Sequence, residues 1–375
     1  MKPAASAHTS SERGVVGWFR RLFGGKASTQ PLEKPANTNA SAPKASALAS
    51  ADVSDAWSEH TPGLAPHARA LGLTFQLPEP LSDAQLAQVQ QLVAAVMEAA
   101  SGSEDAVPSS LPSAALRMLN LAARSDVEVA ELASAINQDA ALTAAVLRVA
   151  SSAAQGAGEV NTVRDAVVRL GVTESARVAA AVAAKTLFSA RSKQAFALFE
   201  GMFNELNVAA MSAAGGAAYL SMERSTGRSD LAYLGGMLHD VGRSLGLSVL
   251  ATLTLADRAP RDLDPQVLQQ VLEEVHVPLG TLAIERWALP AYLLELCASH
   301  HDTRVPDSAS ETHLVRVVSG LILLRARPQP LERLYELEQS LEVLRMTPLQ
   351  TRALDAELRR RATQVRLALG STSQH

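Results

Sequence analysis

Four histidines and one aspartate in the second half of the chain have the residue types of a divalent metal site. His239 stands directly before Asp240, His276 follows in a later helical segment, and His300 and His301 close a third. Imidazole nitrogens and carboxylate oxygens bind borderline and hard divalent ions, and the helices of one bundle can bring them to one point. Each histidine alone is more often an ordinary core or surface residue, so the hypothesis depends on the whole set.

The His239 and Asp240 pair lies in an apolar context that makes its burial costly. The pair follows Leu238 and precedes Val241, and a buried histidine and aspartate must bind something or each other. Two interpretations remain open. In the structural one, the two side chains hydrogen-bond each other and neighbouring helices; in the other, they bind a metal. Gly235 and Gly236, just upstream, favour close helix approach over phosphate binding, and Gly242 and Arg243 complete the motif.

The elements that must position these residues are all predicted to be helices. Of the 375 residues, 47% are hydrophobic but only 4% are aromatic, and an excess of Ala, Leu and Val suits closely packed helices. Apolar residues recur at three- and four-residue spacing. The expected helices cover residues 84–100, 112–123, 126–137, 139–152, 162–170, 173–188, 192–221, 230–255, 264–287, 290–301, 311–325, 330–344 and 348–369.

Composition and charge exclude several classes of protein. The net charge of −4 gives no polycationic surface, so no nucleic-acid partner is expected. Cys297 is the single cysteine, which excludes an intrachain disulfide and a multi-thiolate zinc site. The chain has no apolar run long enough to span a bilayer and no secretory-signal pattern. These features predict a cytoplasmic protein.

The first 80 residues are predicted to be a disordered arm, because a segment rich in Ala, Ser, Pro and Thr buries little apolar surface. Residues 14–26 interrupt it with helical spacing of Trp18, Phe19, Leu22 and Phe23 beside Arg20 and Arg21. Such an amphipathic basic segment could contact a membrane surface or a partner's groove. The alternative is a short segment that folds back on its own domain.

Several motifs in order along the chain resemble one family. His239-Asp240-Val241-Gly242-Arg243 resembles the His-Asp signature of the HD superfamily of metal-dependent phosphohydrolases, and its surroundings are similar to the HD-related output domain, HDOD. The resemblance runs from about Leu111 to Arg325 and is carried by the following segments: Leu111-Pro112 with Met118, Ile136 to Thr143, Leu147 to Ala153, Thr162 to Gly171, and Leu279-Gly280 through Trp287 to Pro290. The domains expected from it are a leading helix and loop at 81–107, an HDOD domain at 108–325 and a C-terminal helical extension at 326–375.

The resemblance also implies that two metal ligands of the active enzymes are missing. The helix before the His-Asp pair offers Leu206 or Asn207 where those enzymes carry a histidine, and Ser319 and Gly320 lie near the position of their final aspartate. Arg243 stands where active relatives often have a lysine. A hydrolytic site needs enough ligands to hold its ion and an open position for water. The chain is therefore expected to lack catalytic residues.

The resulting prediction is a non-catalytic bacterial signalling module that binds a protein partner or a small ligand. No cofactor is expected, with a weakly bound divalent metal as the alternative. The alternative function is a divalent-metal phosphohydrolase acting on a nucleotide or a cyclic dinucleotide. The segment from Leu331 to Leu369 has leucines at helical spacing with alternating charges, which predicts an intradomain cap or, alternatively, pairing in a homodimer.

Overall fold

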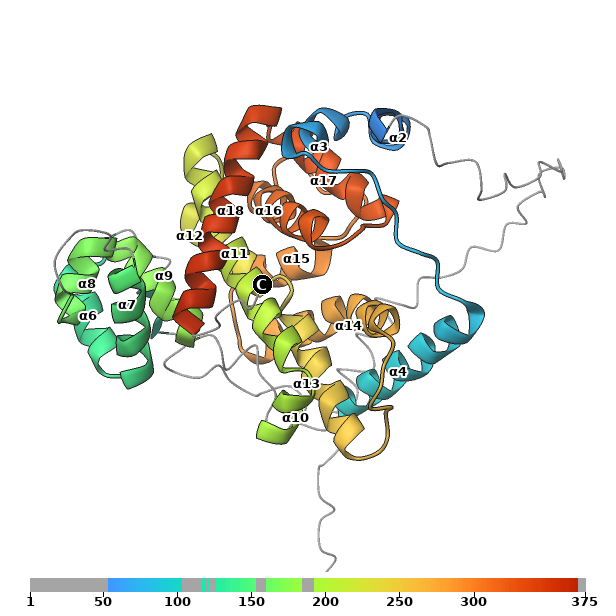
Figure 1. The fold of residues 1–375 in the computed structure, drawn as a ribbon, viewed down its shortest axis with the longest axis horizontal. Coiled ribbons are helices and arrows are strands. Elements are labelled where there is room, and N and C mark those ends of the chain that lie inside the picture. Colours follow the sequence, from blue (N-terminus) through green and yellow to red (C-terminus); the bar gives the residue numbers. More distant parts are fainter. Residues whose placement is uncertain are drawn as a thin grey trace, which may run out of the picture. The chain divides into compact units, whose positions relative to one another are not determined.

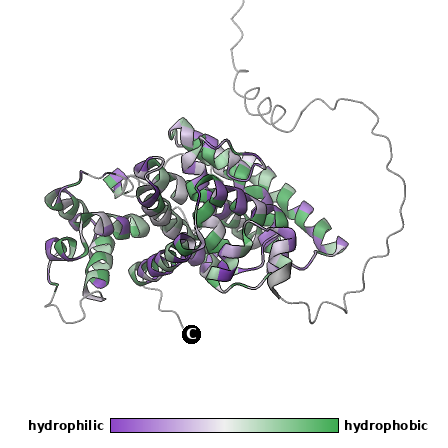
Figure 2. Ribbon diagram, turned by 90° about the horizontal axis from the view of Figure 1, so that it is seen from above, coloured by the Kyte–Doolittle hydropathy of each residue, from purple (hydrophilic) through white to green (hydrophobic). Residues whose placement is uncertain are grey.

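The computed structural model describes residues 53–102, 117–118, 120–121, 124, 126–152, 160–183 and 192–369. All regular structure in this part of the chain is helical (Figure 1), which confirms the predicted fold class. The helices carry hydrophobic and hydrophilic residues together, as amphipathic helices do (Figure 2). Within the described residues, every helix is too short or too polar to cross a membrane.

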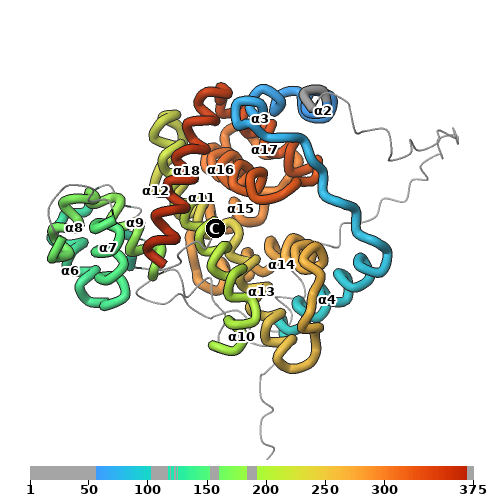
Figure 3. Tube along the Cα trace, in the orientation of Figure 1, coloured from blue at the N-terminus to red at the C-terminus, as the bar shows by residue number. Residues whose placement is uncertain are grey.

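Part of the segment predicted to be a disordered arm is helical in the structure. Residues 53–80 include α2 (Val53–His60) and α3 (Ala65–Leu71), and α3 packs against α18 (Pro348–Leu369) (Figure 3). Trp57 and Leu64 are fully buried in a core cluster with leucines of the C-terminal helices. The composition of residues 53–80 does not predict this structure, because the C-terminal helices that bury Trp57 and Leu64 lie almost 300 residues further along the chain. The amphipathic segment 14–26 lies outside the described residues.

Four short helices pack together in the first half of the predicted HDOD domain. They are α6 (Val129–Asn137), α7 (Ala140–Ser152), α8 (Val163–Leu170) and α9 (Val172–Ala183). Thr162 caps α8 as expected, since its side chain accepts the Asp165 backbone N–H and the Asp165 side chain accepts the Thr162 N–H. The predicted helix 112–123 falls largely outside the described residues.

The second half of the domain supplies the helices around the histidines. They are α10 (Lys193–Leu198), α11 (Glu200–Arg224), α12 (Ser229–Leu238), α13 (Val241–Leu255), α14 (Pro265–Arg286), α15 (Ala291–Ser299) and α16 (Ser310–Ala326). The leading helix α4 (Asp83–Gly102) packs against α13 and α14. The C-terminal segment forms α17 (Leu331–Val343) and α18, which pack on α16 and α11 within the same chain.

Two helices predicted as continuous are divided in the structure. The segment 230–255 breaks at His239 and Asp240, where α12 ends and α13 begins, and the segment 192–221 divides at Phe199. Apolar spacing runs through both breaks, so periodicity alone could not locate them. Asp240 occupies the N-cap of α13, but its side chain makes no capping hydrogen bond. An aspartate at this position normally caps the helix; here its carboxylate is turned to other partners.

Helices α13 and α14 cross at glycines, and this crossing places His276 near Asp240. A Cβ atom on Gly242 would overlap the backbone carbonyl of His276, and one on Gly280 would lie 2.8 Å from Cys297 Sγ. Backbone atoms cannot give way as a flexible side chain can. Gly242 is therefore needed for the spacing of the two helices that carry Asp240 and His276.

Gly242→Ala should lower the free energy of unfolding by about 2 to 3 kcal/mol, because the added methyl group overpacks a backbone contact. Gly201→Ala in α11 is the matched control, since a Cβ there meets no atom within 4 Å; it should change stability by less than about 1 kcal/mol. Urea unfolding of both variants measures the difference. Equal stability of the two variants would contradict the crossing argument.

Candidate metal centre

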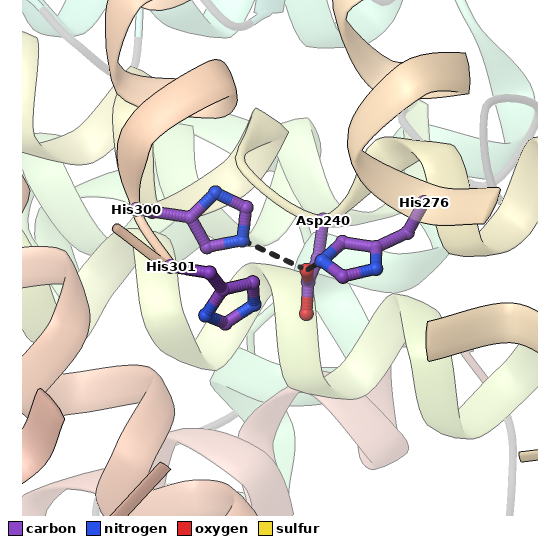
Figure 4. A group of neighbouring side chains, drawn as sticks. All are labelled: Asp240, His276, His300 and His301. Carbon is purple, nitrogen blue, oxygen red and sulfur yellow. Dashed lines mark ion pairs between the residues drawn. The ribbon is translucent and has the colours of Figure 1, made fainter. Parts of the chain in front are cut away.

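Residues from three separate places in the sequence meet at one point. Asp240, His276, His300 and His301 each offer one ligand atom, and these atoms lie within 4.8 Å of one another (Figure 4). His239 lies beside them, with Nε2 3.6 Å from Asp240 Oδ2. The structure thus brings together all five residues that the sequence singled out.

Three of the histidine rings are held in the same way. The Nδ1 atoms of His239, His276 and His300 lie 2.9, 2.6 and 2.8 Å from the backbone carbonyl oxygens three residues earlier. A carbonyl oxygen can only accept, so each Nδ1 carries the hydrogen and donates it. In a neutral ring, Nε2 is then left with a lone pair. The helices themselves thereby fix the tautomer of these rings.

The free lone pairs point at a carboxylate. Nε2 of His276 and Nε2 of His300 each lie 3.5 Å from Asp240 Oδ1, and neither these nitrogens nor Oδ1 has a hydrogen-bond partner. The nitrogens belong to side chains that are 1% exposed. Buried acceptors that face one another are unfavourable. The opposite tautomer would only move the conflict to the backbone carbonyls, whereas a cation between the atoms would satisfy all of them.

The protonation states of the histidines and of Asp240 favour the binding of a metal ion. Burial lowers the pKa of His239 to about 4 and that of His276 to about 3, so both rings are neutral at pH 7. Burial alone would raise the pKa of Asp240, but the Arg243 guanidinium and the neighbouring His239 hold it well below its usual value. Neutral imidazoles and an ionised carboxylate are the forms that bind a metal.

The distances also fit one ion. Two ligand atoms that each lie about 2.1 Å from a tetrahedral ion are about 3.4 Å apart, close to the 3.5 Å separations of His276 and His300 from Asp240. Asp240 Oδ1, His276 Nε2 and His300 Nε2 would hold the ion, with His301 as a fourth ligand and His239 adjacent. The structural interpretation of a direct bond between His239 and Asp240 is not supported, because 3.6 Å exceeds hydrogen-bonding distance.

A buried arginine fixes the orientation of the carboxylate. Arg243 Nε donates to Asp240 Oδ2 at 3.0 Å, and its Nη2 donates to Glu273 Oε2 at 2.6 Å. Oδ2 is thereby occupied, and Oδ1 faces the histidines. Glu273 also pairs with Arg333 of α17. Glu273 was not predicted as part of the site, although it stands three residues before His276 on the same face of its helix.

His301 is held differently from the other histidines. Its Nδ1 lies 2.9 Å from Oε2 of Glu336, a residue of α17, and its Nε2 has no hydrogen-bond partner. Burial raises the pKa of Glu336 to about 7, against the opposing effect of Arg333. The sequence carried no signal for Glu336, since 35 residues separate it from His301.

Two residues at positions where the resemblance implies missing ligands lie beside the cluster. Leu206 of α11 and Ser319 of α16 line a cavity of about 30 Å³ together with His239 and Asp240. The other residues that line this cavity are apolar: Ala209, Ala210, Ala213, Ile322 and Leu323. A space of this size holds a water molecule or two. On this side, the cluster therefore faces hydrocarbon and one hydroxyl group instead of further ligands.

Comparison with known proteins agrees with the motifs and the fold. The family model of the HDOD domain matches residues 109–303. An HDOD domain protein of unknown function from Geobacter sulfurreducens is 22% identical, with a TM-score of 0.52 over 76% of this chain and 100% of that one. A "Putative metal-dependent phosphohydrolase" from Shewanella amazonensis SB2B is 19% identical, with a TM-score of 0.50 over 72% of this chain and 99% of that one.

One curated relative also matches. An uncharacterized protein of Treponema pallidum is 24% identical over 206 residues, which are 53% of this chain and 38% of that protein. The chain thus spans less than half the length of that relative. The solved structures share the helical architecture at low identity. Because the family model covers more than half of the chain, the protein belongs to the HDOD family of HD-related output domains.

Proposed function

We propose that this protein is a regulatory HDOD module that binds one divalent metal at Asp240, His276 and His300 and acts through a protein partner, without hydrolysing phosphoesters. One observation supports the proposed metal binding: buried, unpartnered imidazole lone pairs face an unpartnered carboxylate oxygen. The family resemblance supports a role in bacterial signal transduction. The partner is expected to be a protein of the same signalling pathway.

The surroundings of the cluster argue against turnover. A hydrolytic ion activates a bound water and holds the substrate's phosphoryl oxygens, and sites for drug-sized molecules occupy about 300 to 1,000 Å³. Among the described residues, two cavities that touch the cluster measure about 20 and about 30 Å³. Of Leu206 and Asn207, the two residues that the resemblance places where active relatives carry a histidine, Leu206 lines the larger cavity and provides no ligand atom. The cluster can hold an ion but has little room for a nucleotide.

The alternative function is a metal-dependent phosphohydrolase acting on a nucleotide or a cyclic dinucleotide. One observation favours it. The partly exposed edge of the site carries Arg327 and Arg333 on either side of Glu273, with side chains 29% and 20% exposed. With a divalent ion bound, these guanidinium groups would attract a phosphate group. The name of the Shewanella amazonensis protein agrees with this alternative, although the likeness extends to the fold alone.

Metal binding and turnover are tested together on the full chain. We expect one Zn²⁺ or Mn²⁺ per chain by titration calorimetry, and at least about tenfold weaker binding after His300→Gln or Asp240→Asn, because each substitution removes one ligand. His60→Gln in α2 is the control and should bind as the wild type does. Assays with a phosphodiester, nucleotides and cyclic dinucleotides should show no cleavage.

Two results would decide against the proposal. A wild-type protein that takes up no divalent ion would remove the metal centre. Cleavage of a phosphoester that is lost in Asp240→Asn would establish the enzymatic alternative instead.

The metal-free protein should lose stability as the pH falls below about 6.5. His239 and His276 are neutral when folded, with pKa values of about 4 and about 3, and have a pKa of 6.5 when unfolded. The unfolded chain therefore binds more protons between these values, and each histidine removes roughly 1 kcal/mol per pH unit. Above pH 6.5 this contribution to stability is fully present.

Urea unfolding in the presence of a chelator at pH 7, 6 and 5 measures this slope. His276→Gln lacks one of the titrating rings, so its stability should depend less steeply on pH. An identical slope in wild type and variant would show that burial does not depress the pKa of His276.

A further inference from the structure

The C-terminal extension supplies a side chain to the metal centre. His239, His276 and His300 are oriented by carbonyls of their own helical turns. His301 is oriented by Glu336 of α17, at 2.9 Å between Nδ1 and Oε2. The family match ends at residue 303, so Glu336 lies outside it. We propose that Glu336 is a positioning residue of the metal centre, which is complete only when α17 is docked; this rests on the proposed metal function.

A continuous series of side-chain hydrogen bonds connects Glu336 to the Asp240 carboxylate. Arg333 Nη1 donates to Glu336 Oε1 at 2.5 Å, and Arg333 also donates to Glu273 Oε1. Glu273 in turn accepts from Arg243, which donates to Asp240. The side chains of Arg243, Glu336, Arg333 and Glu273 are 5, 12, 20 and 24% exposed. Charged hydrogen bonds shielded from water in this way are strong and sensitive to geometry.

A second contact ties α17 to the same place. The side chain of Arg316 is buried and donates through Nε to the carbonyl of His300 at 2.7 Å and through Nη1 to Gln339 Oε1 at 2.9 Å. Gln339 lies one helical turn after Glu336. Helix α17 thus contacts both members of the histidine pair: the ring of His301 directly and the backbone of His300 through Arg316.

The same helix also binds the N-terminal segment. Glu338 accepts hydrogen bonds from the backbone N–H groups of Gly63 and Leu64, at 2.5 and 3.1 Å. These two residues join α2 to α3. Displacement of α17 would therefore disturb His301 on one side and the α2–α3 segment on the other.

Docking of α17 and metal binding are thermodynamically linked, so each affects the other. If docking of α17 orients a ligand, docking tightens metal binding, and a bound metal stabilises the docked helix to the same extent. The stability of the docked α17 would then depend on whether the centre holds an ion. Such coupling suits a module that signals by contact.

Glu336→Ala tests the positioning role in the full chain, with Glu342→Ala on the same helix as the matched control. Glu342 is exposed and has the same charge. Loss of an outer partner of a metal-bound histidine typically weakens binding 10- to 100-fold. We expect that loss of Zn²⁺ affinity for Glu336→Ala, no change for Glu342→Ala, and a smaller loss for Glu336→Gln, whose amide oxygen still accepts from His301.

Two further measurements separate positioning from a general loss of structure. The visible spectrum of bound Co²⁺ should change in Glu336→Ala, because the ligand set changes. Hydrogen exchange of α17 should slow on Zn²⁺ binding in wild type, and this slowing should diminish in Glu336→Ala.

The outcomes are distinct. Wild type that binds no metal removes the proposed function together with this inference. Wild type that binds metal, with unchanged affinity and Co²⁺ spectrum in Glu336→Ala, overturns the positioning role alone, even if the variant is less stable.

Discussion

The structure depends on an electrostatic conflict at Asp240. Three imidazole rings use their only hydrogen to bind backbone carbonyls, and two of the remaining lone pairs face an acceptor-only carboxylate oxygen. Neither ring tautomer removes the conflict, and burial lowers the pKa of His239 and of His276. The local helical turns, the Arg243 bond to Oδ2 and the glycine crossing of α13 and α14 all hold the acceptors together. Such an arrangement is stable when a cation shares the lone pairs.

Binding an ion and using it for catalysis place different demands on a protein. Three or four donors suffice to hold a divalent ion, whereas hydrolysis also needs an accessible position for water and space for the substrate. The described residues meet the first demand at Asp240, His276, His300 and His301. On the side of Leu206 and Ser319, the cavity is small and mostly apolar. A site of this composition is therefore better suited to holding an ion than to using it for hydrolysis.

The sequence predicted the parts of the structure that depend on local pattern. Helical periodicity identified the fold class, the motifs indicated five residues that lie together in the structure, and Thr162 marked the start of α8. What it missed depends on contacts distant in sequence. Trp57 is buried by leucines of the C-terminal helices, and Glu336 reaches His301 across 35 residues. The break at His239 and Asp240 could not be predicted, because apolar spacing continues through it. At this break, the Asp240 side chain makes no capping hydrogen bond to α13.

The position of the cluster would let a bound ion act on several helices at once. The cluster residues come from the ends of α12 and α15 and from the middle of α14, so a bound ion would add a further tie between helices that already pack together. Arg243, Glu273 and Arg333 extend these ties to α17, and Glu338 extends them to the loop between α2 and α3. Because these groups are buried or half-buried, removal of one partner leaves others unsatisfied, which costs more than the net worth of a single bond. A network of this kind favours two discrete arrangements over gradual deformation, and that property is what a contact-based switch requires.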